Sequence, residues 1–506
     1  MINPIISFLL LLSLSYSQQI PEEKPNIVLI LADDLGWSDI GSYGSEVETP
    51  NLDWLAENGV RFTQMYNTSK CNPSRAALIT GLYAQQVGYG ATYLQPLENG
   101  ITVGELLQSA GYRTLWAGKH HGYDHPMDRG FDRYYGLKEG ASNHFNPGPR
   151  RENEPGPAQK RPDRPFYEDR KLMQPYSVQQ DYYSTDYFTK YALQWLDEYK
   201  EDEKPFFLYL AYTAPHDPLM AWPEDIDKYK GKYAQGYEAV RKKRFEKQKK
   251  LGIIDESYAL TEPTYVPWES LSDSARQVEE LKMEVYAAMI DRMDQKIGEI
   301  IQKLRTQGKL DNTVFLFLSD NGASAEVVTL PGNGEIGSVG QWTSLGPDWA
   351  NVGNTPHRFY KNYSFEGGIK TPLIISWPKG LGHENEVSTF PAHLIDILPT
   401  LAELAGASYP NEFAGKPVLP AEGQSLLPAV RGEKSQREEA IFWEWSVGKA
   451  VRKGDWKLVS HGKNAVWELY NLKLDPTEIK NLISLQPEIA RELEVEFQNW
   501  KARVSL

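Results

Sequence analysis

Uninterrupted apolar runs alternate with helical periodicities along most of this chain. The apolar runs are typical of strands covered on both faces, and they span residues 26–32, 206–210, 313–318 and 372–376. Apolar residues recur at helical spacing over residues 50–58, 102–109, 184–199, 283–307 and 395–405. Strands that alternate with helices predict an α/β fold, in which helices flank a large, mixed but mostly parallel sheet.

The pattern changes after residue 423. Short alternating runs predict strands at residues 440–445, 448–452, 456–460 and 465–470, and a helical pattern follows over residues 487–504. We therefore expect a main α/β domain over residues 24–423 and a small antiparallel α+β subdomain over residues 424–506.

Three further stretches interrupt the pattern. Residues 143–180 are rich in Pro, Arg and Asp without periodicity, and residues 332–357 are rich in Gly, Pro and Trp, which predicts two long loops. Residues 241–250 read RKKRFEKQKK. A solvated helix face is the favoured interpretation of this run, and an anion site is the alternative.

The N-terminus resembles a secretory signal. Residues 5–12 are apolar, and small residues stand at Ser15 and Ser17 before a plausible cleavage site at Gln18. The first ten residues contain no Lys or Arg, but a membrane anchor, the alternative, would need about 20 apolar residues. We expect a signal peptide over residues 1–17, export to the periplasm or the medium, and no stable membrane insertion.

Composition narrows the class of partner. The 506 residues are 41% hydrophobic and carry a formal net charge of -14, which argues against nucleic acid as a partner. An anionic substrate would have to be held by a local basic pocket. Cys71 is the single cysteine, so no internal disulfide can form.

Oxygen ligands follow two of the predicted strands. Asp33 and Asp34 come directly after the first strand, and Asp320 and Asn321 follow the run at 313–318. Because ligands gather at the carboxyl ends of the strands in open α/β sheets, we expect these residues to meet. Three carboxylates repel one another unless a cation neutralises them, and calcium tolerates crowded oxygen ligands better than magnesium. Taken alone, each pair could instead cap a helix or form a turn.

The segment from Cys71 to Gly81, CNPSRAALITG, carries a more specific signal. It resembles the signature of the type I, formylglycine-dependent sulfatases of the alkaline phosphatase superfamily. Its companions stand in the family order: Asp33-Asp34, Gly118-Lys119-His120-His121, Ala214-Pro215-His216, Asp320-Asn321-Gly322, and Lys361 before Glu366-Gly367-Gly368. The resemblance runs from about Lys24 to the C-terminus and implies an alkaline phosphatase-like fold.

The resemblance also implies a mechanism. A maturation enzyme would convert Cys71 to formylglycine (3-oxoalanine), which hydrates to a diol. One hydroxyl attacks sulfur while the alcohol leaves, and the second hydroxyl then expels sulfate.

The same resemblance gives each residue a role. One calcium ion would be held by Asp33, Asp34, Asp320, Asn321 and the modified Cys71. The catalytic and substrate-binding roles fall on Arg75, which would hold the diol, Lys119 and Lys361, which would bind sulfate, His121, which would take the proton of the diol, and His216, which would protonate the leaving oxygen.

Three features of the sequence differ from the family motifs or lie next to them. The family usually has an aromatic residue between this Lys and His, where the present chain has His120, so spacing assigns the role to His121; packing or surface exposure is the alternative for such a histidine. Lys370 stands where relatives often have Arg, and we interpret it as structural. The sequons at Asn67 and Asn362 abut active-site motifs and are expected to be bare.

Two other functions compete with an active sulfatase. A phosphatase or phosphonate monoester hydrolase of the same superfamily would share the metal pair and the fold, and a non-catalytic binder of sulfated glycans would have lost turnover.

We expect a sulfated polysaccharide or oligosaccharide as substrate. Trp445 could stack on a sugar ring and Glu444 could bind its hydroxyls, with strand packing as the alternative, more so for Trp443.

Overall fold

The computed structural model describes residues 23–91, 95–152, 154, 164–328, 330, 332–381, 384–434 and 436–505. The expected signal peptide at residues 1–17 lies outside the described residues. Among the described residues, no helix is both long enough and apolar enough to cross a bilayer.

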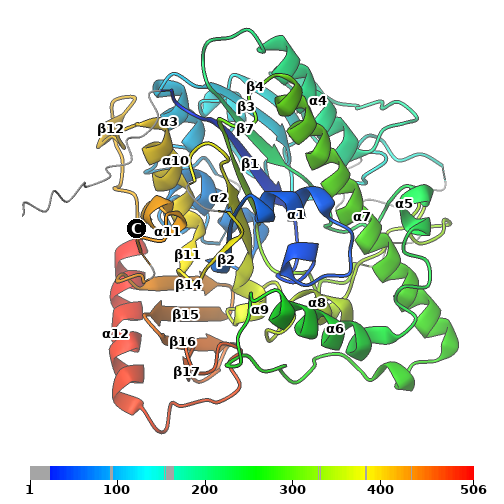
Figure 1. The fold of residues 1–506 in the computed structure, drawn as a ribbon, viewed down its shortest axis with the longest axis vertical. Helices are drawn as coiled ribbons and strands as arrows, with labels where there is room; N and C mark the ends of the chain where they lie inside the picture. The colour runs from blue at the N-terminus through cyan, green and yellow to red at the C-terminus, as the bar shows by residue number, and fades with distance from the viewer. Residues whose placement is uncertain are drawn as a thin grey trace, which may run out of the picture.

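A large mixed sheet forms the centre of the molecule (Figure 1). Its strands are β1 Asn26–Ala32, β2 Gly59–Tyr66, β3 Arg113–Gly118, β4 Arg133–Leu137, β5 Phe166–Glu168, β6 Lys171–Met173, β7 Phe206–Ala211, β8 Thr313–Ser319, β9 Lys370–Ser376, β10 Glu386–Ser388 and β11 Ala392–His393. In the described part of the chain the order is β10, β2, β9, β8, β1, β7, β3, β4, β5, β6, and β11 also pairs with β2. The run β8, β1, β7, β3, β4 is parallel, and β9 is antiparallel to both of its neighbours.

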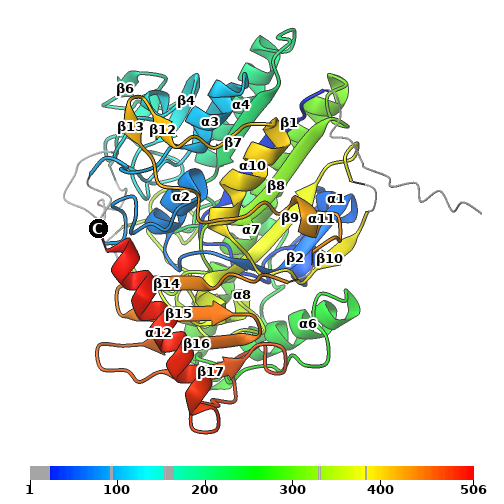
Figure 2. The ribbon, with the colours of Figure 1, turned by 90° about the vertical axis from the view of Figure 1, so that its left-hand side faces the viewer.

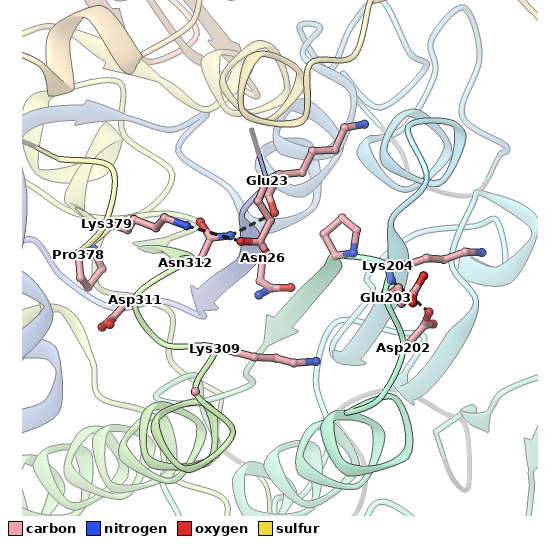
Figure 3. Close-up of a pocket in the computed structure, with 13 residues that line it drawn as sticks. Glu23, Asn26, Asp202, Glu203, Lys204, Lys309, Asp311, Asn312, Pro378 and Lys379 are labelled. Atoms are coloured by element: carbon pink, nitrogen blue, oxygen red, sulfur yellow. Dashed lines mark hydrogen bonds and ion pairs between the residues drawn. The ribbon is translucent and has the colours of Figure 1, made fainter. Parts of the chain in front are cut away.

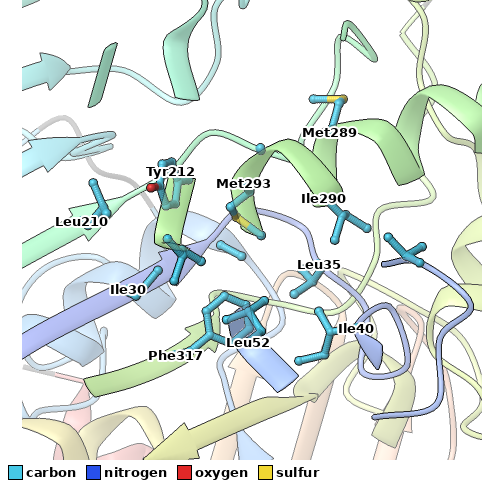
Figure 4. Close-up of a cluster of buried hydrophobic side chains, with 14 of the residues drawn as sticks. Ile30, Leu35, Ile40, Leu52, Leu210, Tyr212, Met289, Ile290, Met293 and Phe317 are labelled. Carbon is cyan, nitrogen blue, oxygen red and sulfur yellow. The ribbon is translucent and has the colours of Figure 1, made fainter. Parts of the chain in front are cut away.

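Helices cover both faces of this sheet. They are α1 Pro50–Glu57, α2 Cys71–Thr80, α3 Val103–Ser109, α4 Ser184–Glu198, α5 Pro223–Asp227, α6 Gly236–Lys250, α7 Asp273–Thr306, α8 Pro347–Gly353, α9 Glu366–Ile369, α10 Ile397–Ala405 and α11 Leu427–Val430. Alternate side chains of β1 face opposite sides. Ile30 packs in the cluster with α1, α4 and α7, whereas Leu29 and Leu31 pack in the cluster with α2, α3 and α10. Figure 4 shows Ile30, Leu210 and Phe317 of the sheet beside Met293 of α7.

A small antiparallel sheet follows in the chain and lies beside the C-terminal helix (Figure 2). Its strands are β14 Ile441–Trp445, β15 Gly448–Lys453, β16 Trp456–His461 and β17 Glu468–Asn471, and the helix is α12 Pro487–Val504. A two-residue pair, β12 Glu412–Phe413 with β13 Lys416–Pro417, precedes them. Val451 and Phe497 belong to the same buried cluster as Leu29 of the central sheet. The small sheet therefore shares a core with the main one.

These features confirm the expected α/β fold with a small C-terminal α+β region, while the boundary at residue 423 stays a prediction. Helix α7 begins at Asp273 rather than at residue 283, because Ser272 caps it by accepting from the amide of Ala275. The expected loops contain short elements: β5 and β6 in the first and α8 in the second.

The interpretation of residues 241–250 as a solvated helix face is wrong for two of its arginines. The run lies on α6, but Arg241 and Arg244 are buried. The guanidinium of Arg244 pairs with Asp39 at 2.5 Å and with Glu46 at 2.8 Å. These partners lie far away in the sequence, so the local pattern could not reveal them.

Candidate active site

The parallel strands deliver the predicted site residues to one edge of the sheet. Asp33 and Asp34 follow β1, Asp320 and Asn321 follow β8, and Lys119 follows β3 directly. Gly118 permits this approach, because its φ is +124° and a Cβ there would lie 1.9 Å from the carbonyl oxygen of Ala211. The structure thus brings the residues that follow β1, β3 and β8 together, as expected for the carboxyl ends of parallel strands.

The three aspartates form a buried acidic centre. The backbone N–H of Asp34 donates to Asp320 Oδ1 at 3.2 Å, and Asp34 itself has a φ of +65°, a strained conformation common at functional sites. Burial and the charge of Asp33 raise the pKa of Asp320 to about 6. Burial also opposes ionisation of Asp33, but Lys119, His216 and Arg75 outweigh it and lower the pKa of this carboxyl.

A hard cation fits this centre. Carboxylate oxygens of Asp33 and Asp34 and a ring nitrogen of His216 lie within 4.8 Å of one another. Asn321 donates its amide N–H to Asp34 Oδ1 at 2.6 Å, while its own Oδ1 is buried without a hydrogen bond from the described residues. The unpaired amide oxygen of Asn321 and the three buried carboxylates together form a set of oxygen donors suited to calcium.

Cys71 is the first residue of α2 and is 2% exposed. One turn later, Arg75 donates from Nε to Asp320 Oδ2 at 2.9 Å and from Nη1 to the carbonyl of Lys119 at 3.1 Å. Cys71 lies near enough to Arg75 and Lys361 to interact electrostatically with both. The helix therefore fixes Cys71 beside the acidic centre and two cationic groups.

Two fully buried lysines flank the aspartates. Lys119 Nζ lies 2.6 Å from Asp33 Oδ2, and Lys361 Nζ lies 2.8 Å from Asp34 Oδ2. Burial opposes the charge of Lys361, but Asp34 and Glu326 outweigh this effect and raise the pKa of Lys361 well above its usual range. An anionic group that enters the site would thus meet fixed positive charge.

The predicted general acid also lies at the centre. His216 Nε2 is 3.5 Å from Asp34 Oδ2, and Nδ1 is 2.9 Å from Asp217 Oδ1. Burial alone would lower the pKa of His216, but Asp34, Asp33 and Asp217 raise it to about 10. A bound divalent cation would attract the same carboxylates and would therefore reduce the rise in the pKa of His216.

The two consecutive histidines are placed differently. His120 packs edge-on against Trp116, with ring centroids 5.0 Å apart. His121 is 9% exposed and has a φ of +58°. Burial, reinforced by Lys119 and Arg75, holds the pKa of His121 well below its usual range. His121 thus lies within electrostatic reach of Lys119 and Lys361, and the catalytic role that spacing gave it stays a prediction.

Sequence reasoning missed two carboxylates at the site. Asp217 orients His216 and accepts from Ser344 Oγ at 2.5 Å; the adjacent His-Asp pair could have indicated it. Glu326 lies 2.9 Å from Lys361 Nζ and 2.5 Å from Lys70 Nζ. Nothing in the local sequence of Glu326 signals these contacts.

The two tryptophans of β14 lie at different depths. Residues two apart in a strand share a face, and both indoles donate to loops of the main domain. Trp443 is 2% exposed and donates to the carbonyl of Asn67 at 2.7 Å, whereas half-buried Trp445 donates to Asn362 Oδ1 at 3.3 Å. Packing therefore accounts for Trp443. The side chain of Glu444 pairs with Lys501, which argues against a free sugar-binding carboxylate.

The remaining expectations concern Lys370 and the sequons. Lys370 Nζ pairs with Glu366 Oε2 at 2.9 Å inside the fold, in agreement with a structural role. Asn67 is fully buried, so the folded protein cannot carry a glycan there. Asn362 uses both side-chain groups, one toward Trp445 and the other toward Glu326.

A cavity of about 800 Å³ lies at the opposite edge of the sheet. It is lined at the amino ends of β1, β7 and β8, by residues such as Asn26, Lys204 and Asn312 (Figure 3). Its charged side chains are of both signs, and Lys379 pairs with Glu23 at 3.5 Å. It is remote from the acidic centre and the catalytic motif, so we do not take it as the active site.

Comparison with known proteins decides the family. A family model described as Sulfatase matches residues 25–407, and a second, described as N-sulphoglucosamine sulphohydrolase, C-terminal, matches residues 355–502. The chain belongs to the sulfatase family. This sulfatase is therefore a sulfuric ester hydrolase.

Individual relatives agree with this assignment. An uncharacterized sulfatase of Schizosaccharomyces pombe is 34% identical, with 95% of this chain and 94% of the relative covered. An arylsulfatase of Klebsiella aerogenes is 35% identical over 80% of this chain and 92% of its own length. Among solved structures, Ps i-CgsB in complex with k-i-k-neocarrahexaose gives a TM-score of 0.70 at 26% identity, covering 94% of this sulfatase and 93% of that chain.

Proposed function

We propose that this sulfatase is an exported, calcium-dependent enzyme that removes sulfate from sulfated polysaccharide or oligosaccharide, with formylglycine at position 71 as the nucleophile. The observation that supports this most strongly is the convergence of Cys71, three buried aspartates and two buried lysines at one sheet edge. Export rests on the signal-like residues 1–17 alone.

Two groups would complete the site. Asp33, Asp34, Asp320, Asn321 and residue 71 would hold calcium, which supplies Lewis acidity toward a sulfate oxygen. Formylglycine supplies a hydrated aldehyde in place of the thiol of Cys71. Because Cys71 is buried in the folded chain, the maturation enzyme would have to act before folding is complete.

The protein's own residues then divide the remaining work. Lys119 and Lys361 would neutralise charge that develops on the sulfate oxygens, and their burial strengthens the effect. Arg75, anchored on Asp320, would hold the nucleophile in place. His216, oriented by Asp217, would protonate the leaving oxygen, and His121 would accept the proton when sulfate is released.

The substrate class rests on two observations. The similar Ps i-CgsB was solved with k-i-k-neocarrahexaose. In this sulfatase, half-buried Trp445 contacts Asn362, the neighbour of Lys361, and so offers an aromatic face beside the sulfate-binding residues.

The test separates this function from its rivals. Purified enzyme should turn over 4-nitrophenyl sulfate much faster than 4-nitrophenyl phosphate, and mass spectrometry of the peptide containing residue 71 should show the aldehyde. Faster phosphate hydrolysis would favour a phosphatase or phosphonate monoester hydrolase. Unmodified Cys71 without turnover, in protein made together with a maturation enzyme, would favour a non-catalytic binder.

Cys71→Ala provides the matched control for this test. The substitution removes one buried sulfur, so the variant should fold and melt within a few degrees of the parent protein. Its turnover should fall to background. Cys71→Ser should be equally inactive in a host that cannot oxidise serine, and normal activity in either variant would refute the proposed nucleophile.

A further inference from the structure

Glu326 is held beside the site by three donors. Its Oε2 lies 2.9 Å from Lys361 Nζ, and its Oε1 lies 2.5 Å from Lys70 Nζ. The amide of Asn362 donates to the same Oε1 at 3.2 Å. The carboxylate is therefore fixed in position rather than free to swing through solvent.

These contacts continue a row of alternating negative and positive side chains that begins at the buried acidic centre and ends at a partly exposed carboxylate. Lys361 bridges Asp34, whose side chain is 2% exposed, and Glu326, whose side chain is 38% exposed. Lys361 itself has no exposed side-chain surface. If Lys361 holds the sulfate, Glu326, which contacts Lys361 and is more exposed, is placed to meet a substituent next to that sulfate.

Trp445 lies on the same outward side. Its indole donates to Asn362 Oδ1 at 3.3 Å, and the amide of Asn362 in turn binds Glu326. An aromatic face and a carboxylate are thus linked through one side chain. This pairing suits a sugar ring, whose apolar face stacks while its hydroxyls donate hydrogen bonds.

The carboxylate carries its charge in the resting site. Burial opposes ionisation, but Lys361 and Lys70 outweigh it and lower the pKa of Glu326 to about 2. A hydroxyl at this position would gain a charge-assisted hydrogen bond. A second sulfate or a carboxylate in contact with Glu326 would meet a like charge, a repulsion that Lys70 and Lys361 weaken and that a glutamine at this position would lack.

We propose that Glu326 is a specificity-determining residue that makes the enzyme prefer a sulfate ester whose adjacent substituents are neutral hydroxyls over one that carries a second anionic group next to the sulfate. This inference rests on the proposed function and deepens it. It names monosulfated, otherwise uncharged rings as the favoured substrates at this subsite.

Aryl sulfates that differ in one substituent test the proposal without knowledge of the natural glycan. The three probes are 4-nitrophenyl sulfate and its 2-hydroxymethyl and 2-carboxylate derivatives. For each enzyme, kcat/KM on the two derivatives is divided by kcat/KM on the parent ester, and variants are compared through these ratios. Comparison of ratios removes the effect of each substituent on the leaving group.

Glu326→Gln should raise the carboxylate ratio by about tenfold, the size expected for removal of one like-charge contact. The hydroxymethyl ratio should fall, because a neutral amide accepts more weakly. Glu326→Asp, which retains the charge, should keep a low carboxylate ratio. Glu335→Gln removes the same charge from an exposed residue further along this segment and should leave both ratios unchanged.

Two results would overturn the inference. An equal loss on all three esters would mean that Glu326 only positions Lys361, and unchanged ratios would mean that it does not face the substrate. Failure of the proposed function is recognised separately, because the unmodified sequence would then fail to hydrolyse 4-nitrophenyl sulfate at all.

Discussion

Trp445 and Trp443 show how two identical side chains on one strand come to differ. Both indoles point toward the main domain, but Trp443 is buried and packs edge-on against Tyr66, with ring centroids 5.2 Å apart. Trp445 keeps part of its ring exposed and lies beside Asn362. The deeper ring is explained by packing, and the shallower ring is available to a ligand.

We predict that Trp445→Ala lowers kcat/KM on a sulfated oligosaccharide by about 5- to 150-fold, as expected for loss of an aromatic contact worth about 1–3 kcal/mol. Turnover of 4-nitrophenyl sulfate, which is too small to need the stacking surface, should change little. Steady-state kinetics on both substrates check this. Trp443→Ala is the control, because its core position predicts a fall in melting temperature. Equal loss on both substrates in Trp445→Ala would indicate damaged packing.

At this scale, the sequence predicted residues that belong to compact motifs. Cys71 and Arg75 are one helical turn apart, and Asp33 and Asp34 follow a strand directly, so their meeting could be foreseen. Glu326 could not, because its contacts with Lys70 and Lys361 depend on the path of a long loop. Contacts between distant segments are set by tertiary packing, which local patterns do not encode.

At the scale of helices and strands, continuous apolar runs were the most reliable signals. Strand β1 begins and ends where predicted, and β8 differs by one terminal residue. Strand β2 has a polar residue, Arg61, within it, so its run was broken and was not predicted. The ends of α7 and the inward arginines of α6 depended on capping and on distant acids.

Helices α1 and α7 are joined by a buried carboxyl whose protonation should affect stability. Asp294 of α7 is fully buried and accepts from the amides of Asn51 and Leu52, at 3.1 Å and 2.8 Å, in the first turn of α1. Burial outweighs these hydrogen bonds and raises the pKa of Asp294 to about 7 from 3.8. The folded state therefore binds this proton more tightly than the unfolded state does.

We predict that this carboxyl makes the protein lose stability as pH rises from about 4 to about 7, by at most about 4 kcal/mol, with no further change above that range. Asp294→Asn cannot ionise, so its stability should lack this component. Urea unfolding of both proteins between pH 4.5 and 8 checks the difference. The stability of the native sequence relative to the variant should be greatest at low pH, and a constant difference would contradict the assignment.

For the whole molecule, the proposed ion links strands β1 and β8 through the aspartates that follow them. Because an ion that binds only the folded state stabilises it by mass action, chelation should abolish activity and lower the melting temperature together. Differential scanning calorimetry with and without chelator checks this, and calcium should restore both properties better than magnesium. An unchanged melting temperature after metal analysis has shown an empty site would contradict the ligand assignment.

The C-terminal sheet is tied to the main domain by buried charges as well as by the shared core. Lys457 of β16 pairs with Glu366 of α9 and with Glu478, each at 2.8 Å, and all three side chains are fully buried. Glu478 also accepts from the amide of Glu366 at 2.8 Å. Since Lys361 lies shortly before α9 in the chain, this network supports the segment that carries the lysine proposed to bind sulfate.

We predict that Lys457→Met destabilises the protein by about 3–5 kcal/mol, because it leaves the buried Glu478 without its cation and Glu366 with Lys370 alone. Lys453→Met is the matched control. Lys453 lies at the end of β15 and forms an exposed pair with Glu496, so its loss should cost about 0–1 kcal/mol. Urea unfolding monitored by tryptophan fluorescence measures both.

Because Leu458 and Phe497 share the main core, the Lys457 variant should still unfold in one transition. A separate early transition would show that the C-terminal sheet is an independent unit, and a cost no larger than that of Lys453→Met would show that the buried pairs do not hold it in place.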